Sequence, residues 1–463
     1  MEHSPQTVCL KCGAGVTSET YHVDPSPVHD LLSSNLPPTG KAQVDAARTI
    51  IKDIASEIAG IEQDILRMHA ALSLLAAKRT ALHDYAEAHK GLISPLRRLP
   101  AEILSDIFIR ALPPFPCKLK SSEIPILLEL VCRRWRDVVR STPALWSRIE
   151  LDYAHKNTVH QSAIASTCLA RSIQHPLTIS LTSSGIYVPP DWVHPTLALI
   201  VAQCERWRTV QLDFLPLYAI EELAEAKGRL PLLERLYVST YDATTTIKGK
   251  RALLDAFSLA PKLRYLELES QEFKDIVTDN ILHLPWNGLT HLIVDLRHAA
   301  DILSILLQCH DLVHFEAHVS NTPMSDDLPE VHLPYLRSLS LKLPEFPTIL
   351  PKLILPALTQ VSLTPLYVLD FTAELWHTNS GFDKLLKKSG CTVRQLEVHD
   401  ESQCIQLRDF VGLLEVLPSL TKLNISETLS NMLPQIFADH ENIRRVIGPN
   451  CHIATIVSSL RED

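Results

Sequence analysis

The sequence of 463 residues is poor in glycine and lacks the short motifs of several enzyme classes. It has only 13 glycines beside 31 prolines, and it contains no phosphate-binding Gly-x-x-x-x-Gly-Lys-Ser/Thr, no Gly-x-Gly-x-x-Gly and no Gly-x-Ser-x-Gly. No His-Glu-x-x-His occurs, and no pair of acids is marked out for glycosidase chemistry. The sequence therefore predicts a protein that is not an enzyme, with no catalytic residues, no cofactor and no metal site.

Long charged and long apolar runs are also missing. The net charge is −9 without a long basic run, which argues against a nucleic-acid partner. No apolar run approaches the roughly 18–20 residues of a membrane span, and the first eleven residues lack the apolar core of a signal peptide. The ten cysteines are scattered, as expected of reduced thiols. We expect a cytoplasmic or nuclear protein, or one found in both, without membrane attachment.

Residues 1–40 show no periodicity and are expected to form a loose tail. Cys9 and Cys12 have the spacing of zinc-binding thiolates, and His22 and His29 follow them. No second Cys-x-x-Cys accompanies the pair, and the histidine spacing is outside the usual range. Two alternatives remain, a zinc knuckle and an unliganded pair, and the spacing favours the second.

Residues 41–91 have the pattern of one long helix with a heptad seam. Apolar residues recur at alternating spacings of three and four, with Arg79 as the polar interruption, at Ile51, Ile54, Ile58, Ile61, Ile65, Met68, Leu72, Leu75 and Leu82. From Lys41 to His89 such a helix is about 70 Å long. The seam indicates either a coiled-coil homodimer or a helix that folds back on its own chain or acts as a spacer.

Residues 92–150 predict a small module of three helices. Pro100 stands at the start of the first helix, Glu102 lies in its first turn, and Ile103 and Leu104 begin its apolar face. A second helix is expected from about Ile124 to Arg140, and Thr142 can cap a short third helix that begins at Pro143. A module this small buries little area alone, so it is expected to need a partner or a neighbouring domain.

These blocks resemble the F-box-like form found in large fungal families. The resemblance rests on Leu99-Pro100-x-Glu102-Ile103-Leu104, Val131-Cys132-Arg133-x-Trp135 and Pro143-x-Leu145-Trp146. It implies binding to a Skp-type adaptor and, through it, to a cullin. The residues expected to dock the adaptor, or to hold the docking surface, are Leu99, Pro100, Ile103, Leu104, Ile107 and Trp135.

Residues 151–463 repeat a Leu-x-x-Leu-x-Leu template at intervals of 22 to 35 residues. Its first positions are Trp207, Leu233, Leu263, Leu289, Leu312, Leu336, Leu358, Val393 and Leu420. The pattern resembles the irregular leucine-rich repeats that often follow an F-box, although the usual asparagine after the strand is replaced, as by Gln271 and Thr428. The predicted fold class is therefore α/β: a long helix, a three-helix module, and a β/α solenoid with a curved parallel sheet and outer helices.

Side chains between the buried leucines are expected to line the inner face of that sheet. The face is mildly acidic, and the candidate target-binding residues are Tyr237, Glu267, Glu269, Asp295, Glu316 and Glu397. His314 and His318 have a metal-like spacing only on a helix, and their segment is predicted to be a strand.

The resemblance and the repeats together predict the substrate-recognition subunit of a Skp–cullin–F-box ubiquitin ligase. The module would dock the adaptor and the repeats would hold an unidentified target protein. One alternative is a scaffold unrelated to ubiquitin that assembles partners through the repeats and the coiled coil. Another is an enzyme whose site is dispersed among the repeats, which a deep pocket with convergent polar groups would indicate.

Overall fold

The computed structural model describes residues 6–7, 15–16, 25–34, 37–113, 123–154, 158–183, 194–215, 217–240, 254–269, 283–321, 329–343, 349–365, 381–400, 405–447 and 451–456. The chain forms two compact units, Met1–Leu99 and Pro100–Asp463. Cys9 and Cys12, the proposed thiolate pair, lie outside the described residues.

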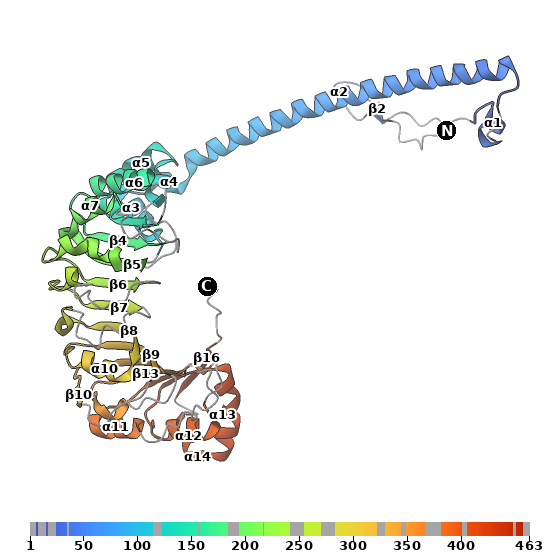
Figure 1. The fold of residues 1–463 in the computed structure, drawn as a ribbon. Helices are drawn as coiled ribbons and strands as arrows, with labels where there is room; N and C mark the ends of the chain where they lie inside the picture. Colours follow the sequence, from blue (N-terminus) through green and yellow to red (C-terminus); the bar gives the residue numbers. More distant parts are fainter. Residues whose placement is uncertain are drawn as a thin grey trace. The chain divides into compact units, whose positions relative to one another are not determined.

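The first unit is dominated by one helix, α2, which spans Lys41–Ile93 (Figure 1). The prediction of a long helix is confirmed, and at 53 residues it is about 80 Å long. Gly60 is the one weak helix former before the last turn, and no proline interrupts the helix. It ends where Ser94 turns to extended backbone angles and Pro95 begins the 3-10 turn η1 (Pro95–Arg98). The described residues ahead of α2 form the short strands β1 (Gln6–Thr7) and β2 (Gly15–Val16) and the helix α1 (His29–Ser34).

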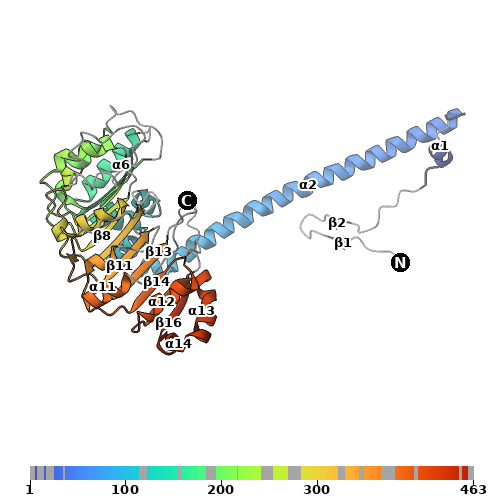
Figure 2. The same ribbon diagram turned by 60° about the horizontal axis from the view of Figure 1, so that its bottom comes forward.

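The second unit is built on a parallel sheet of 12 strands, which curves through the unit (Figures 1 and 2). The sheet follows chain order apart from two strands that pair separately, β10 (Val331–His332) and β12 (Leu353–Ile354). Its strands are β3 (Arg148–Asp152), β4 (Leu177–Thr182), β5 (Trp207–Leu215), β6 (Arg235–Thr240), β7 (Tyr265–Glu269), β8 (His291–His298), β9 (His314–Asn321), β11 (Ser338–Leu343), β13 (Gln360–Pro365), β14 (Gln395–Val398), β15 (Lys422–Ser426) and β16 (His452–Ile456).

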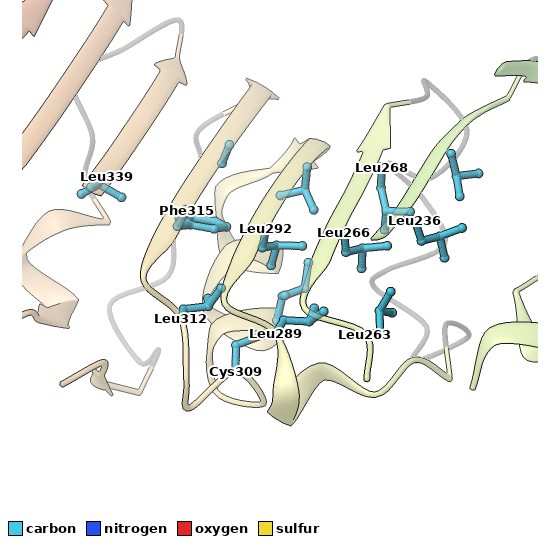
Figure 3. Packing of buried hydrophobic residues seen from close by; sticks show 14 of the residues in the cluster. Leu236, Leu263, Leu266, Leu268, Leu289, Leu292, Cys309, Leu312, Phe315 and Leu339 are labelled. Atoms are coloured by element: carbon cyan, nitrogen blue, oxygen red, sulfur yellow. The ribbon is translucent and has the colours of Figure 1, made fainter. Parts of the chain in front are cut away.

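The repeat template coincides with nine of these strands, β5 to β15 without the separate pair. Its middle position stays in register from strand to strand, so that Leu236 pairs with Leu266, Leu266 with Leu292, and Leu292 with Phe315. Figure 3 shows these side chains packed in rows, with the first-position leucines beside them. Each row is fully buried only because the next strand covers it, which is why a solenoid is stable as a stack and not as a single repeat.

Helices and 3-10 turns connect the strands and lie along the outer side of the curve (Figure 1). Two of the connecting segments contain only short elements: the segment 197–206 divides into α7 and η4, and the described part of 250–259 forms only the turn η6. The connecting elements are α6 (Thr158–Arg171), α7 (Leu197–Val201), η4 (Cys204–Arg206), α8 (Leu217–Glu221), η5 (Glu222–Ala226), η6 (Asp255–Phe257), η8 (Trp286–Gly288), α10 (Ala299–Leu306), η9 (Leu350–Lys352), α11 (Phe382–Ser389), α12 (Leu407–Glu415), α13 (Glu427–Asp439) and α14 (Glu441–Ile447).

Threonines help to fix the register in place of the missing asparagines. At the entry to three strands a threonine hydroxyl donates to a carbonyl of the preceding repeat, from Thr290 to Arg264 (3.1 Å), from Thr359 to Arg337 (3.2 Å) and from Thr421 to Arg394 (3.1 Å). The same carbonyls also accept backbone N–H groups, as Arg264 does from Thr290 and His291. The entry turns are therefore tied to one another across the stack.

The helical module consists of α3 (Ala101–Arg110), α4 (Ile124–Glu129), α5 (Arg133–Arg140) and η3 (Pro143–Trp146). The expected single helix 124–140 is wrong, because Cys132 takes extended backbone angles and its Sγ accepts the N–H of Trp135 at 3.5 Å, which starts a new helix. Cys132 is therefore an exposed capping residue and not a packed one. Thr142 also differs, since its hydroxyl donates to the Val138 carbonyl at 2.7 Å and does not cap η3.

Candidate functional sites

The interior of the helical module is closed. Leu104 and Phe108, one turn apart on α3, are both buried, and the Phe108 ring lies 4.7 Å from the ring of Trp135. Trp146 is also buried, and its Nε1 donates to the Val139 carbonyl at 2.9 Å. Because the buried indole N–H has a partner, the module fills its own core without leaving that donor unsatisfied.

A buried carboxylate joins the module to the start of the repeats. Glu129 on α4 accepts from Arg140 Nε at 3.0 Å and from Arg171 Nη1 at 2.6 Å. Arg171 belongs to α6, and its guanidinium lies 4.3 Å from the centroid of the Trp146 ring. The bond to Glu129 raises the pKa of Arg140. This arrangement fixes α4, α5 and α6 relative to one another.

The outer side of the module exposes aliphatic side chains. Ile103 and Ile107, at i and i+4 on α3, are 47% and 43% exposed. Leu127, Leu130 and Val131 on α4 and its last turn are 61%, 71% and 58% exposed. We call these five residues the module surface. They contrast with Leu104 and Phe108, which are buried on the adjacent side of α3, about 100° around the helix, so the two sides of one helix serve two purposes.

The predicted adaptor-binding residues separate into these two sides. Pro100, Ile103 and Ile107 are exposed, Leu99 and Trp135 are half-buried, and Leu104 is fully buried. Leu104 can therefore act only by holding the module together with Phe108, whereas Trp135 packs against Phe108 and is still partly exposed. Leu127, Leu130 and Val131 are not among the predicted docking residues. Leu127 lies on α4, Leu130 and Val131 follow its end, and all three side chains are exposed.

The second candidate site is the sheet face that looks away from the leucine core. Three rows of side chains cross it in register. One row reads Arg235, Tyr265, His291 and His314; the next reads Tyr237, Glu267, Ile293 and Glu316; the third reads Ser239, Glu269, Asp295 and His318. The strands are about 4.8 Å apart, so each row is a continuous line of neighbours.

Four aromatic rings follow one another across β6 to β9. The ring centroids are 4.9 Å apart from Tyr237 to Tyr265, 6.0 Å from Tyr265 to His291, and 5.8 Å from His291 to His314. Burial raises the pKa of both tyrosines and lowers the pKa of both histidines. The ladder therefore consists of neutral rings near pH 7, and it confirms that His314 lies on a strand and not on a helix.

Carboxylates lie directly beside this ladder. The Tyr265 hydroxyl donates to Glu267 Oε2 at 2.6 Å, and Lys342 Nζ lies 2.6 Å from Glu316 Oε1. Burial, followed by the negative charge of Glu267, raises the pKa of Glu269. Burial disfavours the charged carboxylate and the neighbouring Glu267 disfavours it further, so a nearby cation would lower the pKa of Glu269 again.

Five of the six predicted target-binding residues are brought together here. Tyr237, Glu267, Glu269, Asp295 and Glu316 occupy the neighbouring strands β6 to β9. Glu397 lies on β14, three strands beyond Glu316 through Ser340 and Ser362, or about 14 Å away. Its Oε1 is 2.7 Å from His399 Nε2. The sequence analysis did not predict the ring ladder. Its rings nevertheless have a regular place in the template: Tyr265, His291 and His314 directly precede the second apolar residue, and Tyr237 directly follows it.

The described residues were also searched for metal-binding groups and for membrane-spanning helices. Among these residues no group of three or more His, Cys, Asp or Glu side chains has a metal-binding arrangement. None of the described helices is long and apolar enough to cross a membrane.

Comparisons with known proteins add little to this geometry. Neither a scan of family models nor a search of curated proteins found a match. Among solved structures, the chain is similar to a crystal structure of a Bacteroides fragilis protein from a structural genomics project, at 12% identity and a TM-score of 0.31, covering 56% of this chain and 77% of that one. The fold is an α/β fold with a long N-terminal helix and a 12-stranded parallel sheet, and its class is read from the strands themselves.

Proposed function

We propose that the protein is the substrate-recognition subunit of a Skp–cullin–F-box type ubiquitin ligase and has no catalytic activity of its own. The observation that carries the proposal is the module surface. Five aliphatic side chains are exposed on α3 and α4 of a module that resembles an F-box and whose core is already closed.

The exposed set has the chemistry of an adaptor-docking face. Apolar side chains gathered on one module are unusual on a free surface, and covering them is favourable at about 25 cal/mol per Å². Because Leu104, Phe108 and Trp146 are packed without the adaptor, docking requires no opening of the module. Binding energy is then not spent on rearranging the receptor.

The sheet face is the proposed target site, and its chemistry suits an extended segment that carries positive charge. The rings of Tyr265, His291 and His314 offer flat partners for a cation or a side-chain stem. Glu267 and Glu269 offer hydrogen-bond acceptors beside these rings. The pKa of Glu269 is raised, and a cation bound beside it would stabilise the charged form of its carboxylate. Proximity of the bound target to a ubiquitin-charged enzyme would then complete the function.

The adaptor proposal is tested by co-purification of the full chain with a Skp-type adaptor. The Ile103→Asp, Ile107→Asp double variant places two charges on the module surface and is expected to lose binding. Leu199→Asp is the matched control, because Leu199 on α7 is 45% exposed but lies outside the module. Circular dichroism checks that each variant is folded.

If the wild-type chain does not bind the adaptor, or if the folded double variant still binds, the ligase proposal fails. The protein would then be a scaffold that uses the same sheet face without ubiquitin. Binding of a lysine- and arginine-rich peptide to the sheet face, and its loss in Glu267→Gln, Glu269→Gln, would test the target chemistry separately.

A further inference from the structure

The helix α2 carries an apolar seam that no described residue of its own unit covers. None of its residues is buried. With Ile51, Ile58, Ile65, Leu72 and Arg79 at heptad position a, the d positions are Ile54, Ile61, Met68, Leu75 and Leu82. The nine apolar side chains of this seam are all exposed by more than a third. A narrow seam of this kind is typical of a helix that pairs with another helix.

The charges of α2 are separated along its length. Residues 53–64 contain four acids, Asp53, Glu57, Glu62 and Asp64, and no lysine or arginine. Residues 69–80 contain Lys78 and Arg79 and no acid. A helix with an acidic segment and a basic segment of equal length is complementary to a second copy of itself that runs in the opposite direction.

A parallel pair would place like charges together. Glu57 at position g would face Glu62 at position e of the second copy, and both symmetric contacts would be repulsive. Arg79 would share a core layer with Arg79 of the second copy, so two cations would meet in a partly dry seam. The apolar residues alone would allow this arrangement, but the charges oppose it.

We propose that two copies of this chain form an antiparallel coiled coil through α2, centred between Leu66 and Arg67. In this register Ile65 faces Met68 of the second copy, and Ile58 faces Leu75. Every apolar seam residue from Ile51 to Leu82 then meets another apolar residue, except Ile54, which faces Arg79. The flanking positions also lose the repulsion between Glu57 and Glu62.

One flanking pair of opposite charges carries the specificity, and it occurs twice in the dimer. Glu57 faces Lys78 of the second copy at the g positions, and Glu62 faces His69 at the e positions, where the parallel pair would place Glu57. In the antiparallel dimer, Arg79 of one copy lies beside Glu57 of the second copy, which is a favourable neighbour for a cation. In the parallel dimer its neighbour would be the second Arg79. The antiparallel form also places the two Ile93 residues about 80 Å apart, whereas a parallel form would bring them to within about 10 Å.

Charge variants of the full chain distinguish the parallel from the antiparallel dimer, because the dissociation constant is expected to change in opposite directions in the two. Sedimentation equilibrium is expected to show a dimer for the wild type. Glu57→Lys should raise the dimer dissociation constant about tenfold, because it turns two attractive pairs into repulsive ones. Lys78→Glu should do the same, and the double variant Glu57→Lys, Lys78→Glu should restore an affinity near that of the wild type.

Asp53→Lys is the matched control, since it makes the same change of charge at position c on the outer side of α2. It is expected to leave the dissociation constant nearly unchanged. Tighter association of the Glu57→Lys variant would overturn the antiparallel direction. In a parallel dimer this change would turn the repulsion between Glu57 and Glu62 into an attraction. A monomeric or trimeric wild-type chain would overturn the dimer itself. Adaptor binding is not part of this readout, so either proposal can fail alone.

Discussion

The long helix α2 and the 12-stranded sheet use apolar side chains in opposite ways. In the sheet, Leu266, Leu292 and Phe315 are completely buried because neighbouring repeats cover them. In α2 not one residue is buried, although its seam is just as regular. The sheet completes its core by repetition within one chain, whereas a single helix has no second surface to complete.

The helical module combines both patterns on one helix. The inner side of α3 is closed by Leu104 and Phe108, as in the sheet, and its outer side exposes Ile103 and Ile107, as in α2. A buried apolar row therefore stabilises the fold, whereas an exposed apolar row is available for association with another surface. The comparison predicts that equal truncations will have unequal effects in the two regions.

The largest effect is expected inside the sheet. Phe315→Ala removes a fully buried ring from β9, and we expect the free energy of unfolding of the second unit to fall by about 3–5 kcal/mol. Leu74→Ala truncates a side chain of α2 that is 74% exposed and outside the heptad seam, and should change stability by less than about 0.5 kcal/mol.

All six tryptophans follow residue 99, so tryptophan fluorescence during urea unfolding reports on the second unit alone. Far-ultraviolet circular dichroism of the same samples adds the signal of α2. If Phe315→Ala were as mild as Leu74→Ala, the rows would not form the tight core that the structure shows.

The sheet could be predicted from the sequence because one template recurs at each strand. The pairs Leu236–Leu266 and Leu396–Leu423 were both expected from their template positions, and both are in register. Register itself was uncertain without the asparagines. Threonines at the strand entries, such as Thr290, donate to a carbonyl of the previous repeat, and this is a contact between distant residues that no local pattern reveals.

The candidate sites were less predictable. A helical period identifies an apolar side of α3, but it does not tell whether Ile103 or Leu104 is covered, because covering depends on α5 and η3, which pack against α3 from later in the chain. The break at Cys132 rests on one extended residue whose thiol caps the next helix. The ring ladder requires the register of four strands at once.

An intermediate effect is expected at the carboxylate that ties the module to α6. Glu129→Gln keeps the shape of the side chain and removes the charge that Arg140 and Arg171 share. We expect a loss of about 1–2 kcal/mol, less than for a fully buried pair because both arginines are partly exposed. Asp106→Asn on the exposed part of α3 is the control, with almost no loss expected in the same urea unfolding measurement. Equal losses in the two variants would mean that Glu129 does not join the helices.

The smallest effect is expected in the ring ladder, and it depends on pH. Burial lowers the pKa of His314, and burial and the neighbouring His314 lower that of His291, so the folded protein binds protons there less readily than the unfolded chain does. Stability from these rings is therefore fully present above the unfolded pKa of about 6.5 and is lost as the pH falls from that value through the lower pKa of the folded state.

Replacing one ring tests this sign. Between about pH 7.5 and 5.5, the wild type should lose more stability than His314→Gln does, by less than about 1 kcal/mol because the rings are partly exposed. The raised pKa of Glu269 acts in the opposite direction but is common to both proteins, so it largely cancels in the difference. His310→Gln, on the exposed turn before β9, should keep the wild-type slope. If His314→Gln and His310→Gln had the same slope, His314 would be as open to water as a turn residue, and the sheet face would lack the desolvated ring ladder that the target proposal requires.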